Sequence, residues 1–231
     1  MRAEQLAVVQ GWDHTRTTLR RWNANPWPVT IRWALGSLAV TATLLFVTWV
    51  VAATTPADPA AYSYPGVTRP AALHDFGFLL YRNGLVLALH AMACVAGFVA
   101  GSTLPVAAAG YKGWWRKVHD HAGKLAIAFV CGATMFSLGT QAWALGVAVG
   151  ESAAERQMSP ALFMLALLPH AIPELCALFL PLAAWIVASR RGQWHQLLAA
   201  TFFTTAVAVP VLIACAGWEV WVSPHLLHFL K

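Results

Sequence analysis

The sequence predicts an all-α, polytopic membrane protein, built as a bundle of about five membrane-crossing helices. Hydrophobic residues make up 59% of its 231 residues and charged residues only 10%, whereas a soluble domain has about 25% charged residues. Five apolar stretches are each long enough to cross a bilayer, which takes about 20 residues of helix. Lys and Arg cluster beside these stretches, which indicates contact with anionic lipid headgroups and argues against a nucleic-acid partner.

Short polar segments separate the five apolar stretches. We expect the stretches at Val29–Ala53, Phe76–Thr103, Lys124–Val149, Pro160–Ser189 and Leu197–Val222. Residues 1–28 precede them as a cytoplasmic or interfacial segment, and residues 29–231 form a single transmembrane domain. In the N-terminal segment, an amphipathic surface helix would place several apolar side chains on one side, and an ordinary solvated arm is the alternative. These side chains are Leu6, Val9, Trp12, Leu19 and Trp22.

Two prolines in the fourth stretch predict a broken helix. Because Pro169 and Pro173 each remove a backbone donor, we expect a short helix over Ala161–Leu168 at the interface and a new helix after Pro169. Residues Ala171–Ser189 alone are long enough to cross the bilayer, since nineteen residues of helix cover roughly 28 Å.

The placement of Lys and Arg predicts the orientation in the membrane. With the N-terminus inside, eleven of the 15 basic residues fall on the cytoplasmic side and four fall outside. Cytoplasmic loops carry such an excess of positive charge. An odd number of spans then places the C-terminus outside.

Polar residues in the apolar stretches point to a site near the outer leaflet. His170 and Glu174 are four residues apart and share one helix face. Glu174 within an apolar run is a functional hypothesis by default, although it can instead stabilise the first turn of a helix. Glu219 near the end of the last stretch, and Arg82 and Asn83 at the start of the second, lie at the same predicted depth. We therefore expect one polar cluster, in which His170, Asn83 or Arg82 lies within hydrogen-bonding reach of at least one of the two glutamates. An Arg–Glu contact there would neutralise charge and tie the spans together.

No metal site, cofactor or catalytic residue is predicted. His119-Asp120-His121 is one short run in a basic loop, without further ligands at the spacing of a metal site. The four cysteines lie within apolar stretches and match no metal or redox motif. Nucleophile-elbow, zinc-protease, phosphate-loop and dinucleotide motifs are also missing, so the sequence does not predict an enzyme.

Glycines at regular spacing indicate close helix packing. Gly97 and Gly101 form a GxxxG pair in the second stretch, and Gly132, Gly139 and Gly146 recur every seven residues in the third. Small residues let two helices approach closely, within one chain or between copies. The pattern leaves both open, a homo-oligomer included.

The same residues carry a family resemblance. The segment Pro169-His170-Ala171-Ile172-Pro173-Glu174-Leu175 resembles the Pro-His-Gly, two residues, Glu-Leu segment of the stage II sporulation protein M family of multispan membrane proteins. Arg82-Asn83-Gly84-Leu85 is similar to the family's asparagine at the start of an earlier span. The run from Glu219 to Ser223-Pro224 is similar to an acid followed by a Thr-Pro pair. Ala171 stands where the family prefers glycine, and Gln141-Ala142 where it commonly has Asn-Gly.

The resemblance implies a non-enzymatic subunit or scaffold of a multiprotein cell-envelope complex in the cytoplasmic membrane of a prokaryote. The sporulation members act with peptidoglycan-degrading partners. The expected partners are other membrane or envelope proteins, such as an ATPase or a hydrolase. The alternative is a transporter or channel component with a solute or ion site near Glu174 and Glu219. An intramembrane hydrolase using His170 and Glu174 is a third reading, but it lacks a nucleophile or a third metal ligand at recognisable spacing.

Overall fold

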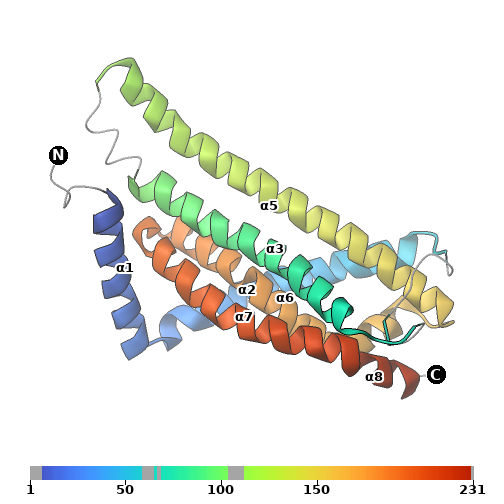
Figure 1. Ribbon diagram of the computed structural model, residues 1–231. Coiled ribbons are helices and arrows are strands. Elements are labelled where there is room, and N and C mark those ends of the chain that lie inside the picture. Colours follow the sequence, from blue (N-terminus) through green and yellow to red (C-terminus); the bar gives the residue numbers. More distant parts are fainter. Residues whose placement is uncertain (1–6, 59–64, 67–68, 104–111, 230–231) are drawn as a thin grey trace. The chain divides into compact units, whose positions relative to one another are not determined.

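The computed structural model describes residues 7–58, 65–66, 69–103 and 112–229, and all regular secondary structure in them is helical (Figure 1). Its elements are α1 (Ala7–Ala24), α2 (Trp27–Thr54), α3 (Leu73–Phe98), η2 (Val99–Thr103), α5 (Trp114–Glu155), α6 (Pro160–Arg190), η3 (Trp194–Gln196), α7 (Leu197–Trp221) and α8 (Ser223–Phe229). Five helices are long and apolar enough to cross a membrane. The predicted all-α fold with five spans is confirmed, and the chain is a multi-pass membrane protein.

The prediction of a helix break in the fourth span is wrong. α6 runs without interruption from Pro160 to Arg190, through both Pro169 and Pro173. Each proline removes one backbone donor, but its fixed φ suits a helix. At membrane depth no water is available to backbone groups, so a helix remains the conformation that satisfies most of them. α7 likewise continues through Pro210.

α5 begins earlier than the predicted third stretch. It covers Trp114–Glu155, 42 residues in all, so that His119-Asp120-His121 lies at its helical start. The prediction of a loop at these residues is therefore wrong. No glycine or proline, the strongest helix breakers, stands between Trp114 and His121.

The chain forms two compact units, and each membrane-crossing helix contributes a segment to both. The first unit consists of Met1–Ser37, Leu87–Thr134 and Phe179–Val207, and the second unit of Leu38–Val86, Met135–Leu178 and Ala208–Lys231. The expected division into residues 1–28 and one transmembrane domain stays a prediction. The polar residues singled out above all belong to the second unit.

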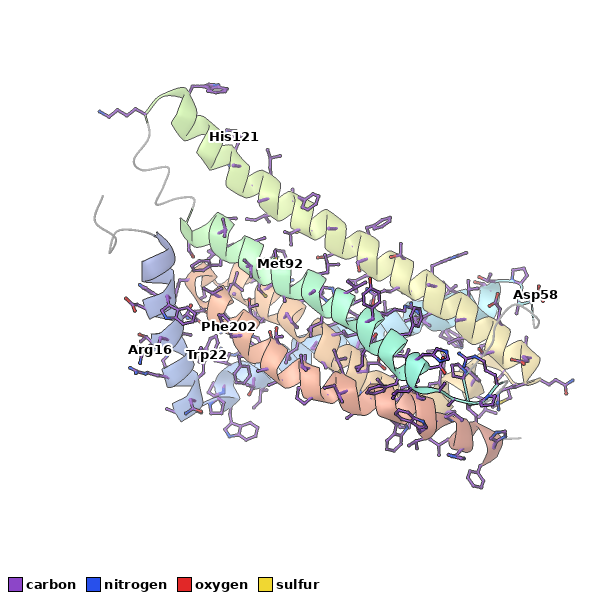
Figure 2. All side chains as sticks on the ribbon, viewed as in Figure 1. Arg16, Trp22, Asp58, Met92, His121 and Phe202 are labelled. Carbon is purple, nitrogen blue, oxygen red and sulfur yellow. The ribbon has the colours of Figure 1, made fainter. Side chains whose placement is uncertain are left out.

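In the first unit, α1 packs through one narrow face. Gly11, Thr15, Thr18 and Trp22 are buried along it, and the Trp22 ring meets Trp33 edge-on with 5.1 Å between centroids. Figure 2 shows Trp22 on this helix. Trp12, however, is 58% exposed. Residues 7–24 are thus a helix, and Trp22 packs inside the unit while Trp12 does not; contact of this helix with the membrane surface stays a prediction.

Gly97 and Gly101 serve packing inside the first unit. They lie where α3 passes into η2, a short π-helical turn. A Cβ at Gly97 would lie 2.7 Å from Nε1 of Trp185, and a Cβ at Gly101 would overlap the side chain of Trp194. Only glycine permits this approach, so the pair joins helices within the chain.

In the second unit, Asp75 fixes the start of α3. Its carboxylate accepts a hydrogen bond of 2.9 Å from the backbone N–H of Ala72, which is one half of a capping box. It also pairs with the guanidinium of Arg69, and this hydrogen bond raises the pKa of Arg69 above its usual value. Asn83 follows on α3, roughly two turns after Asp75.

Candidate functional site

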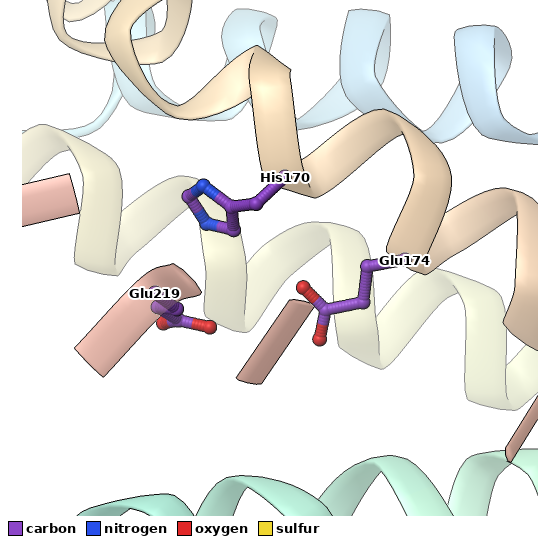
Figure 3. A group of neighbouring side chains, drawn as sticks. All are labelled: His170, Glu174 and Glu219. Carbon is purple, nitrogen blue, oxygen red and sulfur yellow. The ribbon is translucent and has the colours of Figure 1, made fainter. Parts of the chain in front are cut away.

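Three helices of the second unit bring the predicted polar residues together. α6 carries His170 and Glu174 one turn apart, α7 carries Glu219, and α3 carries Asn83. The imidazole of His170 and the carboxylates of Glu174 and Glu219 face the same space (Figure 3). The structure therefore places these residues in one cluster, as the sequence predicts, and their role stays a prediction.

His170, Glu174 and Glu219, which we call the trio, form a compact group of possible ligands. One ring nitrogen of His170 and one carboxylate oxygen from each glutamate all lie within 4.8 Å of one another. His170 and Glu174 are 5% and 8% exposed, and Glu219 is half-buried. Charged groups at such depth are costly unless they are paired, so the surrounding groups decide the chemistry of the trio.

Two hydrogen bonds orient the trio. Nδ2 of Asn83 donates to Oε1 of Glu174. The hydroxyl oxygen of Ser223, the fully buried first residue of α8, lies 3.1 Å from Nδ1 of His170. Ser223 was not predicted as a site residue. Its sequence signals are a polar side chain four residues after Glu219 and its place in the Ser223-Pro224 pair that carries part of the family resemblance.

Arg82 departs from the prediction. Its side chain is exposed, and its guanidinium lies 5.8 Å from the ring centroid of Phe78. Among the described residues no ion pair joins Arg82 to Glu174 or Glu219. Neighbouring residues on a helix point about 100° apart, and Asn83 is the one that reaches Glu174. The expected hydrogen bond to a glutamate is therefore made by Asn83, and the Arg–Glu ion pair is not among the contacts of the described residues.

A cavity of about 310 Å³ opens beside the trio. The trio, Arg82 and Asn83 line it together with Thr48 of α2 and Gln141 of α5, and the rest of its wall is mainly aliphatic. Carboxylate, imidazole and amide side chains thus converge on one space in an otherwise apolar region. Such an arrangement can bind a cation or a small polar solute.

The contact between Ser223 and His170 does not make an accessible nucleophile. Ser223 is fully buried and does not line the cavity, so a substrate held there would not meet its hydroxyl. A nucleophile must be within reach of the reacting atom as well as of its base. The polar atoms that line the cavity are therefore suited to binding an ion or a solute.

Comparison with known proteins gives no match: no family model, curated protein or solved structure matches the chain. The resemblance to the stage II sporulation protein M family accordingly stays a prediction based on three short motifs. The function is proposed below from that prediction and from the geometry.

Proposed function

We propose that the chain is a non-enzymatic, membrane-embedded subunit of a multiprotein complex of the cell envelope. The observation that carries this proposal is the uneven packing of α5. Its apolar window is only 11% buried within the chain, compared with 56% for α6. Lipid can cover such a surface, but a partner helix packs against it closely where small residues line it.

The glycines of α5 mark the surface that a partner would contact. In the second unit, a Cβ at Gly146 would lie 2.5 Å from Cβ of Val51, so this glycine packs against α2. At Gly139, in the same unit, and at Gly132, in the first, a Cβ would meet nothing within 4 Å in the described part of the chain. Gly146 therefore packs within the chain, whereas Gly132 and Gly139 leave space on α5 for a helix of a partner.

Co-purification tests this proposal. The protein is extracted in mild detergent from its native membrane, and accompanying proteins are identified by mass spectrometry. We expect the native chain to retain defined membrane or envelope partners, an ATPase or a hydrolase among the candidates. Gly132→Leu and Gly139→Leu should reduce their recovery, because leucine fills the surface. Gly77→Leu, at an equally open glycine of α3, is the matched control.

Two outcomes would contradict the proposal. A native chain that purifies alone, with no partner in cross-linked membranes either, is not a subunit of a heteromeric complex. Equal recovery of partners with all three glycine variants would show that α5 is not the contact surface. Loss of a homodimer in the α5 variants would identify a second copy of the chain as the occupant of this surface.

A transporter or channel component is the second candidate, favoured by the polar cavity of the second unit. Purified protein in liposomes would be assayed for proton or Zn²⁺ influx with entrapped indicator dyes. Under this hypothesis Glu174→Gln abolishes the flux of a folded protein, while Glu155→Gln, at an exposed position of α5, preserves it. Flux no greater than in protein-free liposomes would eliminate the hypothesis for these ions.

We further propose a prokaryotic cytoplasmic membrane, with the N-terminus inside and the C-terminus outside. The distribution of Lys and Arg supports this orientation. On a background without native cysteines, a cysteine at Ala57 or Gln157 should react with a membrane-impermeant reagent applied from outside. One at Lys112 should be protected until the membrane is opened. The opposite pattern would reverse the orientation.

A further inference from the structure

The trio has the geometry of a metal-ion site that needs only a small adjustment. Ligands of a tetrahedral ion lie about 2.0–2.2 Å from it, so any two are roughly 3.4 Å apart. The ligand atoms of the trio are already within 4.8 Å of one another. Rotation of the flexible glutamate side chains is enough to close the remaining difference, because their backbones are fixed by α6 and α7.

Charge at the trio also favours a divalent cation. Two carboxylates so close together repel each other unless a positive charge lies between them. The described residues provide no ion pair to either one, and Arg82, which lines the same cavity, attracts Glu219 only from beyond ion-pair distance. A divalent ion bound by two carboxylates and a neutral imidazole forms an assembly with no net charge. Burying it in an apolar region therefore costs less than burying the carboxylates alone.

Ser223 and Asn83 hydrogen-bond to side chains of the trio, as neighbouring residues do to the ligands of metal sites. Ser223 engages Nδ1 of His170, which leaves Nε2 as the ring nitrogen for an ion. Asn83 holds one oxygen of Glu174, which leaves the other carboxylate oxygen for coordination. In metal sites the outer hydrogen bonds fix the ligand orientation in this way, and removing one typically weakens binding by about 10–100-fold.

We infer that His170, Glu174 and Glu219 bind a divalent transition-metal ion through one nitrogen and two oxygen atoms, with Zn²⁺ as the best match. Imidazole is a ligand for transition metals, whereas Ca²⁺ and Mg²⁺ prefer sites made of oxygen atoms alone. Three protein ligands and an open position suit an exchangeable or water-bearing ion. This inference departs from the expectation of no metal site and does not rest on the proposed function.

Metal titration of the purified protein tests the inference. The chain carries a tag without histidine, is stripped with EDTA in detergent, and is titrated with Zn²⁺ against a chromophoric chelator. We expect one Zn²⁺ per chain, with affinity reduced at least tenfold in His170→Gln, Glu174→Gln and Glu219→Gln. His225→Gln and Glu155→Gln remove the same group types at exposed positions and should bind as the native chain does.

Two further measurements separate lost binding from lost folding. Zn²⁺ should raise the unfolding temperature of the native chain, and EDTA should reverse the rise, because an ion that binds only the folded state stabilises it. Ser223→Ala keeps all three ligands and should weaken binding about tenfold. X-ray absorption of the Zn²⁺-loaded protein should show nitrogen and oxygen ligands, one of them imidazole.

The following results would contradict the proposed metal site or the choice of ion. No stoichiometric Zn²⁺ on the folded native chain would refute it, as would equal binding by the trio variants and the two control variants. Tighter binding of Ca²⁺ or Mg²⁺ than of Zn²⁺ would refute the choice of ion. Each result is independent of partner recovery, so the site and the proposed function can fail separately.

Discussion

Replacing Gly146 by alanine tests how tightly α2 and α5 pack in the second unit. The new Cβ would lie 2.5 Å from Cβ of Val51 and 2.9 Å from the carbonyl oxygen of Thr48. Carbon contacts are optimal at about 3.5–4.0 Å. The carbonyl belongs to the backbone of α2 and cannot rotate away, so the two helices must separate locally.

The expected loss follows from two opposing effects. Overpacking costs about 1–3 kcal/mol, and alanine recovers up to about 1 kcal/mol of helix propensity relative to glycine. We therefore expect Gly146→Ala to lower the free energy of unfolding by up to about 2 kcal/mol. For a chain of this size that corresponds to a fall in Tm of up to roughly 8 °C.

Thermal unfolding in detergent, followed by tryptophan fluorescence, measures this effect. Gly139→Ala is the matched control, because it lies seven residues earlier on α5 and its Cβ would meet nothing within 4 Å. It should be as stable as the native chain, or more stable by up to about 1 kcal/mol. If Gly146→Ala unfolds no earlier than Gly139→Ala, the described packing of α2 on α5 is wrong.

Substitutions at three more positions test other contacts by the same unfolding assay. Asp75→Ala should lose about 1 kcal/mol or more, because the backbone N–H of Ala72 loses its capping partner, whereas Asp75→Asn retains an acceptor and should lose less. Glu174→Ala should lose about 1–3 kcal/mol by leaving the Asn83 amide without its acceptor. Glu174→Gln should stay near the native value, and an equal loss in both would argue against this hydrogen bond. Arg82→Gln should change stability by no more than about 0.5 kcal/mol, as surface substitutions usually do, and a larger loss would reveal an ion pair.

The candidate site was predictable in part, because an acid in an apolar segment needs a partner wherever the fold places it. Glu174, Glu219 and Asn83 are recognisable from this rule and from their common predicted depth. Ser223 is not, since a serine near a span end carries no such signal. Arg82 was expected to contact an acid, but a shift of one residue on a helix turns a side chain by about 100°.

The five membrane-crossing helices follow from the sequence alone. The hydrophobicity of a segment is a property of its own residues, and in a bilayer an apolar segment of that length has almost no alternative to a helix. The direction in which each helix face points, and the helices that it contacts, depend on the tertiary structure. It decided that Gly97, Gly101 and Gly146 pack inside the chain while Gly132 and Gly139 do not. It also decided that α6 continues past Pro169, because whether a proline interrupts a helix depends on what surrounds the freed carbonyl groups and not on the proline alone.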